Sequence, residues 1–284
     1  MRKTIILLSS KRSGSTAIFK CFQKHSKVKI PHYNQKIENW EIQYWSLASL
    51  ALKGNLNPFK KRMSVSFPKL NIDFNKNITE KFFFDLWNQI LDNNGGIVFD
   101  KSPQYLGDFK AMNLLKKFII NGNNVKIFAL IRDPKDVITS QFELWKEYTL
   151  NDSLEKREKF LLKQYQHLEK LQKENNIPLY YYEKLSRDPV KYMTEIYNHC
   201  ELPIENNTWS HLKPVSIGRY STSVLINKKK WQFSDKFKEF LTKYNYLEEQ
   251  LNYKQKIFFK ILRIILEFKR LIPLKIKKKL KNYK

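Results

Sequence analysis

Residues 3–25 read KTIILLSSKRSGSTAIFKCFQKH, and this stretch decides how the chain begins to fold. Residues 4–8 are an apolar, β-prone run, which is typical of a strand buried on both faces. A small polar stretch follows at residues 10–15, and apolar side chains then recur at helical spacing in residues 16–24. The sequence therefore predicts a strand, a tight loop and a helix N-terminus in direct succession.

This succession is a geometry that can hold a phosphate group. Unpaired backbone amides at the start of a helix point toward an anion, and the helix dipole favours negative charge there. The side chains add two cations and three hydroxyl groups around one glycine. The candidate phosphate-binding residues are Lys11, Arg12, Ser13, Gly14, Ser15 and Thr16. An ordinary strand-turn-helix without a ligand is the alternative reading.

The loop is not a Walker A motif. That motif requires two glycines with a Lys and a Ser or Thr after the second one. This loop has a single glycine, Gly14, and no Lys follows it before Ser15 and Thr16.

Composition limits the class of protein. A chain of 284 residues with 42% apolar residues can form one large domain with an appendage. The net charge of +26 predicts attraction to polyanions such as nucleic acid, anionic lipid, nucleotides or glycans. Two cysteines, Cys21 and Cys200, give no disulfide framework and favour a reducing compartment. We find neither a signal-peptide pattern nor an apolar run of about 18 residues, and we therefore expect a cytoplasmic protein.

Strands and helices alternate along the chain. Further strands are expected at residues 97–99, 125–131 and 177–182, with a short edge strand at 28–30. Helices are expected at residues 39–52, 78–91, 108–119, 134–148 and 153–173, and residues 54–77 are expected to form a loop. This alternation predicts an α/β fold with a parallel sheet of four to five strands flanked by helices. We expect residues 1–250 to form this domain and residues 251–284 to form a separate tail.

A second anion-binding motif follows the third long strand. Residues 125–140 read VKIFALIRDPKDVITS, with Arg132 at the strand end and Pro134 at the first position of a helix. Ser140 follows Arg132 by eight residues, so both side chains could hold one phosphate group. The alternative is that Arg132 and Asp133 form a surface pair and that Ser140 is an incidental helix residue.

The two motifs together resemble those of sulfotransferases that use 3′-phosphoadenosine 5′-phosphosulfate (PAPS), nearest to the protein-tyrosine, Golgi-type and bacterial branches. The first loop is similar to the family's 5′-phosphosulfate loop, commonly Pro-Lys/Arg-Ser-Gly-Thr-Thr. Arg132 and Ser140 resemble the pair that holds the 3′-phosphate of the nucleotide. The resemblance implies the P-loop-like sulfotransferase fold.

Shorter segments add to the resemblance. Tyr182, in the YYEKL sequence of residues 181–185, looks like a family tyrosine that packs near the adenine. Ser216 and Lys230 are similar to a late Ser and a Lys-Trp element that contact the nucleotide phosphates in the protein-tyrosine branch. Lys101, in the DKSP sequence of residues 100–103, resembles a lysine that sits at the transferring sulfonyl group.

The resemblance implies transfer of the sulfonyl group of PAPS to a hydroxyl or amine, with 3′,5′-bisphosphoadenosine (PAP) as product and without a metal. A glycan or glycolipid is the acceptor that we expect. Arg12 and Lys101 would stabilise the charge that develops on the leaving phosphate. The alternative function is a non-catalytic, basic nucleotide- or nucleic-acid-binding protein with a kinase-like phosphate loop.

The acceptor hydroxyl also needs a general base. Here the chain departs from the protein-tyrosine branch, in which a Glu follows the first helix. His32 is our candidate, because an imidazole has a near-neutral pKa. Glu38 and Glu41 are the alternatives, although we expect both to be solvated helix charges.

Residues 254–284 contain twelve Lys and Arg and one acidic residue, Glu267. Apolar residues such as Phe258, Ile261 and Ile265 recur among them at helical spacing. A basic amphipathic helix predicts a partner with an anionic membrane surface, here the inner membrane face. The alternative is a terminal helix packed on the core. Nucleic acid is less favoured, because Lys outnumbers Arg and bidentate base reading needs Arg.

Overall fold

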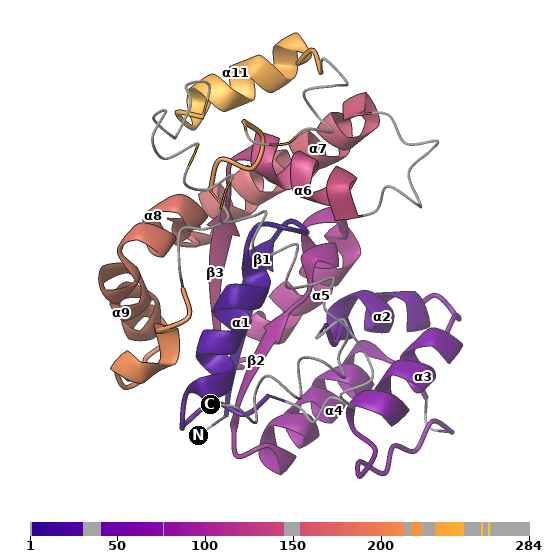
Figure 1. The fold of residues 1–284 in the computed structure, drawn as a ribbon. Coiled ribbons are helices and arrows are strands. Elements are labelled where there is room, and N and C mark those ends of the chain that lie inside the picture. Colours follow the sequence, from indigo (N-terminus) through magenta and orange to yellow (C-terminus); the bar gives the residue numbers. More distant parts are fainter. Residues whose placement is uncertain are drawn as a thin grey trace, which may run out of the picture.

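The computed structural model describes residues 2–30, 41–75, 77–144, 154–212, 217–221, 223, 231–246, 257 and 261. A four-stranded parallel sheet forms the centre of this part of the chain, with the strand order β2-β1-β3-β4 (Figure 1). The strands are β1 (Lys3–Ser9), β2 (Ile97–Lys101), β3 (Val125–Ile131) and β4 (Leu179–Tyr181). The predicted α/β class with a parallel sheet and flanking helices is confirmed.

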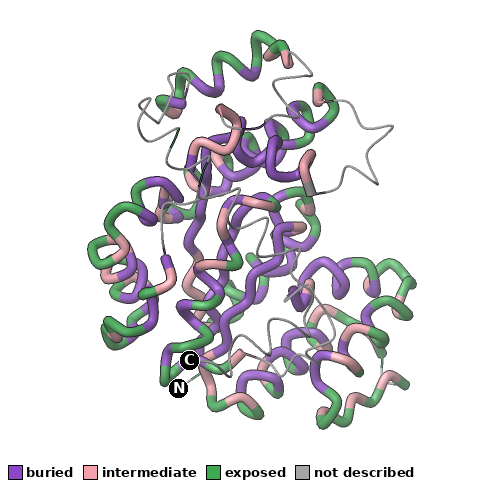
Figure 2. Tube along the Cα trace, viewed as in Figure 1, coloured by how far each residue is buried: buried purple, intermediate pink, exposed green. Residues whose placement is uncertain are grey.

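Alternate side chains of β1 enter two different cores, as the period of a strand requires. Ile5 and Leu7 join one core, which α1 (Ser15–Lys24), α8 (Tyr182–Arg187) and α9 (Pro189–His199) complete. Ile6 and Leu8 join the other core. All seven residues of β1 are buried, and Figure 2 shows the buried strands enclosed by helices that are exposed on their outer sides. The apolar run of residues 4–8 therefore marks a strand between two layers.

The second core lies under the remaining helices and contains the largest side chains, including Trp45 and Trp87. These helices are α2 (Tyr44–Ala51), α3 (Asn57–Ser66), α4 (Glu80–Asn93), α5 (Phe109–Ile120), α6 (Pro134–Leu144), α7 (Leu154–Asn175) and α11 (Asp235–Lys243). Short 3-10 turns occur at η1 (Pro103–Gly107) and η2 (Asn206–Trp209). Figure 1 shows that α11 lies at the same end of the molecule as α6 and α7.

Three expectations about local structure were wrong. The predicted loop 54–77 contains the helix α3 (Asn57–Ser66), in which Pro58 occupies the first turn and Phe59 and Met63 are buried one turn apart. Residues 28–30 form only one bridge, between Lys29 and Val98, instead of an edge strand. The helix expected from residue 39 begins at Tyr44, since the preceding residue has a left-handed backbone.

None of the helices in the described part of the chain combines the length and the hydropathy that crossing a bilayer requires. Of the basic tail, the structure describes only Ile257 and Ile261, so the boundary expected at residue 250 and the amphipathic helix lie outside the described residues.

Candidate active site

The candidate site lies at the carboxyl edge of the sheet. The register pairs Leu7 with Lys101 and Ser9 with Leu130, so β1, β2 and β3 end close together. The phosphate loop follows β1, Lys101 ends β2 and Arg132 follows β3. In parallel sheets, ligands bind outside the carboxyl ends of the strands. The two predicted motifs and the Lys101 segment therefore meet at one edge, as their positions after strands suggested.

Two left-handed residues shape the loop. Arg12 has φ 74° and Gly14 has φ 95°. The hydroxyl groups of Ser10 and Ser13 are hydrogen-bonded to each other across the same turn. A Cβ atom on Gly14 would lie 2.2 Å from Cδ2 of Tyr182. Gly14 is therefore required both by its backbone angle and by the close approach of the Tyr182 ring.

The N-terminus of α1 lacks the side-chain cap that α4, α5 and α9 have. Thr79, Asp108 and Asp188 each accept a hydrogen bond from a backbone amide in the first turn of their helix. Gly14 occupies the same position before α1 and makes no side-chain cap. The first amides of α1 are thus without the side-chain acceptor that usually satisfies them, which suits an anion.

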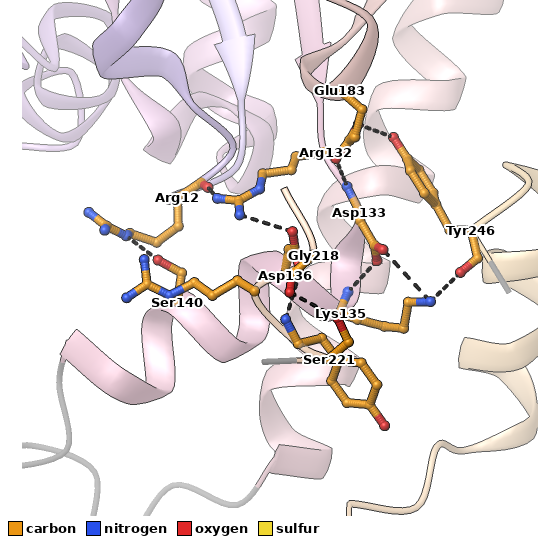
Figure 3. Close-up of polar contacts among 12 residues, drawn as sticks. Arg12, Arg132, Asp133, Lys135, Asp136, Ser140, Glu183, Gly218, Ser221 and Tyr246 are labelled. Atoms are coloured by element: carbon orange, nitrogen blue, oxygen red, sulfur yellow. Dashed lines mark hydrogen bonds and ion pairs between the residues drawn. The ribbon is translucent and has the colours of Figure 1, made fainter. Parts of the chain in front are cut away.

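The structure connects the two predicted phosphate motifs through Arg12. Its Nε donates a hydrogen bond to Oγ of Ser140 at 2.9 Å (Figure 3). Arg132 lies behind this pair and is almost fully buried. Its Nη1 donates to the carbonyl of Arg12 at 3.0 Å, and its Nη2 donates to Oδ2 of Asp136 at 3.1 Å. Arg12 therefore contacts Ser140, while Arg132 supports the loop backbone.

Further contacts fix Arg132 and the start of α6. The guanidinium carbon of Arg132 lies 5.2 Å from the centre of the Tyr182 ring. The second oxygen of Asp136 accepts the backbone amide of Tyr220 at 2.7 Å. Glu183 accepts the amide of Asp133 and the hydroxyl of Tyr246, each at 2.9 Å (Figure 3). Segments from β3, α8 and the late chain thus hold the second motif in place.

Lys101 occupies the other side of the loop and is 5% exposed. Its Nζ donates a hydrogen bond to Oγ1 of Thr16 at 3.3 Å and lies 3.9 Å from Oε1 of Glu41. Burial lowers the pKa of Lys101, while Glu41 and Asp100 oppose that shift. A buried amine beside the first hydroxyls of α1 is in a position to contact a group transferred from a loop-bound phosphate.

Asp100, next to Lys101, is also buried. Its carboxylate accepts the hydroxyl of Tyr105 at 2.6 Å and that of Ser102 at 3.4 Å. Burial raises the pKa of Asp100 to about 7, against the hydrogen bonds from these two hydroxyls. Ser102 in turn accepts the amide of Gln43 at 3.0 Å, which ties this turn to the start of α2.

The expectation that Glu41 is a solvated helix charge was wrong. Glu41 lies before α2 and is only 9% exposed, and its carboxylate faces Lys101. No local sequence pattern distinguishes Glu41 from other acidic residues, because its burial depends on a segment 60 residues away.

Four candidates fall outside the described residues: His32, Glu38, Ser216 and Lys230. Their predicted roles stay predictions. Among the residues that the structure describes, no group of three His, Cys, Asp or Glu side chains could hold a metal ion.

The fold and the site define an α/β protein with a phosphate loop at the carboxyl edge of its sheet. A family model described as the sulfotransferase family matches residues 4–206, and the chain belongs to this family. Its activity is therefore sulfonyl transfer, and the predicted P-loop-like sulfotransferase fold is confirmed.

Two solved structures show the same fold. The sulfotransferase domain from the curacin biosynthetic pathway has a TM-score of 0.54 and 16% identity, covering 87% of this chain and 98% of its own. The sulfotransferase domain from the Synechococcus PCC 7002 olefin synthase has a TM-score of 0.53 and 18% identity, covering 93% and 94%. A search of the curated proteins finds no match to this sequence.

Proposed function

We propose that this protein transfers the sulfonyl group of PAPS to a hydroxyl group, or an amine, of a glycan or glycolipid acceptor. The observation that carries the proposal is the position of Lys101, whose Nζ lies 3.3 Å from Thr16 Oγ1 and 3.9 Å from Glu41 Oε1. A phosphate loop, a buried amine and a carboxylate converge there. These are the groups that an in-line displacement at sulfur needs.

Each group has one role in this proposal. The amides of the loop and of the α1 N-terminus bind the 5′-phosphosulfate, with Thr16 as a further donor. Ser140 binds the 3′-phosphate together with an arginine, for which Arg12 has the better geometry and Arg132 is the residue that the family resemblance indicates. Tyr182 lies against Gly14, beside the nucleotide.

Chemistry takes place between Lys101 and Glu41. The acceptor oxygen forms a bond to sulfur while the bond from sulfur to the bridging phosphate oxygen breaks, and PAP leaves with that oxygen. Lys101 and the loop amides stabilise the negative charge that grows on it. The acceptor proton passes to a base. Glu41 takes precedence over His32 for this role, because its carboxylate is buried at Lys101.

A sulfonyl-transfer assay tests the proposal. The full chain is incubated with radiolabelled PAPS and a panel of glycans and glycolipids, and the labelled product is separated. Lys101→Ala is the control, because it should abolish transfer without unfolding the domain. Binding of PAP without transfer to any acceptor would favour the alternative, a nucleotide-binding protein without catalysis.

The basic tail supports a peripheral location at an anionic membrane. Each Lys or Arg near such a surface contributes about 1 kcal/mol, and this attraction falls off within a Debye length. Co-sedimentation of the full chain and of a form lacking residues 254–284 with anionic and neutral vesicles tests the assignment. Equal sedimentation of the two forms would contradict it.

A further inference from the structure

Asp100 and Lys101 are neighbours at the end of β2, so their side chains point to opposite faces of the sheet. Val98 shares the face of Asp100 and belongs to the core that contains α2. Phe99 shares the face of Lys101 and belongs to the core that contains α1. Lys101 accordingly reaches Thr16 at the start of α1, while Asp100 faces the start of α2.

Each carboxylate oxygen of Asp100 accepts one hydroxyl group. Oδ2 accepts the Tyr105 hydroxyl at 2.6 Å, and Oδ1 accepts the Ser102 hydroxyl at 3.4 Å. The oxygen of Ser102 accepts the backbone amide of Gln43 at 3.0 Å, and that of Tyr105 accepts the amide of Trp45 at 3.5 Å. A hydroxyl group has one proton, so both chains of hydrogen bonds run from an amide through a hydroxyl to the carboxylate. We call Asp100, Ser102 and Tyr105 the Asp100 relay.

The Asp100 relay takes the place of a helix cap. Gln43 is the N-cap residue of α2, but its backbone is left-handed, with φ 58°, and its side chain makes no capping hydrogen bond. Trp45 is at the second helical position, where a capping side chain usually accepts the amide. Tyr105 accepts this amide instead. The end of β2 therefore fixes the start of α2.

Glu41 lies in the chain that leads into this helix start. It precedes Gln43 by two residues, and its carbonyl accepts a hydrogen bond from Nη1 of Arg62 in α3 at 3.1 Å. Its Oε1 lies 3.9 Å from Nζ of Lys101, the neighbour of Asp100 in β2. Two successive strand residues thus place both charged groups of the proposed chemistry, Lys101 directly and Glu41 through the relay.

On the basis of the proposed function, we infer that Asp100 is a positioning residue for sulfonyl transfer. Through the relay it holds the segment that carries Glu41, so that the carboxylate of Glu41 stays beside Lys101 and receives the proton of the acceptor there. Asp100 is 1% exposed and both of its oxygens accept hydroxyl groups of the relay, so it does not contact the transferred group itself. Breaking the relay should therefore displace Glu41 and leave the phosphate loop unchanged.

Amide hydrogen exchange, followed by NMR on the full chain, tests the relay itself. At pH 8 the carboxyl group of Asp100 is ionised, because its pKa is about 7. Ser102→Ala should speed the exchange of the Gln43 amide, and Tyr105→Phe that of the Trp45 amide. We expect about fivefold in each case, the effect of a lost helix cap. Unchanged exchange of both amides would overturn the inference.

The pKa of Lys101 reports where Glu41 lies. Burial lowers this pKa, and the carboxylates of Glu41 and Asp100 oppose that shift. Ser102→Ala and Tyr105→Phe should therefore lower it further, by at most the amount that Glu41→Gln does. In protein that already carries Glu41→Gln, either variant should change it only by the smaller effect that passes through Asp100. ¹³C NMR of lysine-labelled protein, with the signal assigned by Lys101→Arg, measures this cycle.

Two control variants remove buried hydroxyl groups of the same kinds outside the relay. Ser49→Ala removes a hydroxyl that donates to a carbonyl within α2 at 2.9 Å. Tyr44→Phe removes one that donates to the carbonyl of Phe83 at 2.6 Å, the length of the Tyr105 bond in the relay. Both controls should lower the melting temperature but leave the pKa of Lys101 unchanged. Loss of stability is thereby separated from loss of position.

The rate of PAPS consumption, with water as the acceptor, should follow the same cycle. In this step the water oxygen bonds to sulfur, the bond from sulfur to the bridging phosphate oxygen breaks, and the proton passes to Glu41. Ser102→Ala and Tyr105→Phe should slow a single turnover about ten- to hundredfold, because the base is misplaced. Neither should slow it further in the Glu41→Gln protein, and PAP affinity should stay within about twofold.

An equal fall in the pKa of Lys101 with and without Glu41→Gln would overturn the inference, because Asp100 would then act on Lys101 directly. Loss of PAP binding in the relay variants would also overturn it, since the relay would then support the phosphate loop. Unchanged PAPS consumption in Glu41→Gln, together with the expected pKa changes, would instead refute the proposed role of Glu41 as base. The two failures are therefore distinguishable.

Discussion

Arg12 Nε and Ser140 Oγ are joined by a hydrogen bond of 2.9 Å across 128 residues of sequence. This contact connects the loop after β1 to the middle of α6 and so brings the two predicted phosphate motifs together. The buried Arg132 side chain donates a hydrogen bond from Nη1 to the carbonyl oxygen of Arg12. In the proposed binding mode, Arg12 is therefore the arginine that shares the 3′-phosphate with Ser140.

Ser140→Ala should weaken PAP binding about 10- to 150-fold, because a hydrogen bond to a charged group contributes roughly 1.5–3 kcal/mol. Adenosine 5′-phosphate, which lacks the 3′-phosphate, should bind the variant and the wild type alike. Calorimetric titration of both nucleotides measures the difference.

Arg132→Ala serves as the comparison for this prediction. It should weaken both nucleotides and lower the melting temperature, because a buried support of the loop is removed. If instead Arg132→Ala affected PAP alone, Arg132 would be the direct partner of the 3′-phosphate.

PAP should stabilise the fold without added metal. The prediction rests on the N-terminus of α1, which has no side-chain cap. The buried Lys101 and the arginines Arg12 and Arg132 lie beside it. At 100 times its dissociation constant, a ligand adds about 2.7 kcal/mol to the free energy of unfolding. Thermal melting with PAP, with and without EDTA, measures this gain. A melting curve that responds only to ATP with magnesium would contradict the prediction.

The sheet could be predicted because the local sequence of each strand is sufficient to identify it. Residues 125–131 are apolar except for Lys126, as is typical of a buried parallel strand, and the predicted anion-binding residues directly follow such runs. The same local reading missed α3, since its Asn, Pro and Lys residues are also common in loops, and Phe59 and Met63 are the only large apolar side chains on its buried face.

The contacts among the side chains of the site could be predicted less well from the sequence. The sequence indicated that Arg12, Lys101, Arg132 and Ser140 gather at one edge, because strand ends bring them there. Which arginine contacts Ser140 depends on the left-handed backbone at Arg12 and on Asp136 as a competing partner. The burial of Glu41 likewise arises from a contact with a distant strand. Tertiary packing determines both of these contacts, and the local sequence does not show them.

Glu41→Gln should reduce kcat by about 10²–10⁴, the usual contribution of a general base, while PAP affinity stays within about twofold. The amide keeps the size of the side chain but cannot accept the proton. Lys101→Ala should also act mainly on kcat, because its charge is needed on the transferring group. Single-turnover rates and PAP titrations are compared for both variants.

His32→Ala is the discriminating control for the base. Full activity in His32→Ala and lost activity in Glu41→Gln would assign the base to Glu41. The reverse pattern would return the role to His32.

Gly14→Ala should destabilise the domain by roughly 2–5 kcal/mol, the sum of left-handed strain and overpacking against Tyr182. The matched control is Gly122→Ala. Gly122 also has a positive φ, of 81°, but nothing lies within 4 Å of its added Cβ. It should therefore cost only the backbone strain, about 1–2 kcal/mol. Urea unfolding of both variants measures the difference, and equal losses would mean that the Tyr182 ring moves aside freely.

The pKa of Asp100 predicts a specific pH dependence of stability. Burial raises this pKa to about 7, from an ordinary value of 3.8. Between these two values the folded protein keeps a proton that the unfolded chain has released. The free energy of unfolding should therefore fall as pH rises from about 4 to 7, by roughly 2–4 kcal/mol, and then level off.

Asp100→Asn removes this dependence, because the amide is neutral at every pH and can still accept the hydroxyl of Tyr105. The difference between wild type and variant isolates Asp100, since other buried carboxyl groups, such as Asp133 and Glu183, also have raised pKa values and contribute equally to both proteins. Urea unfolding at intervals between pH 4 and pH 8 measures the two profiles. Wild type should lose stability relative to Asp100→Asn as pH rises to 7. Parallel profiles would mean that Asp100 is ionised throughout, held by the positive charge of Lys101.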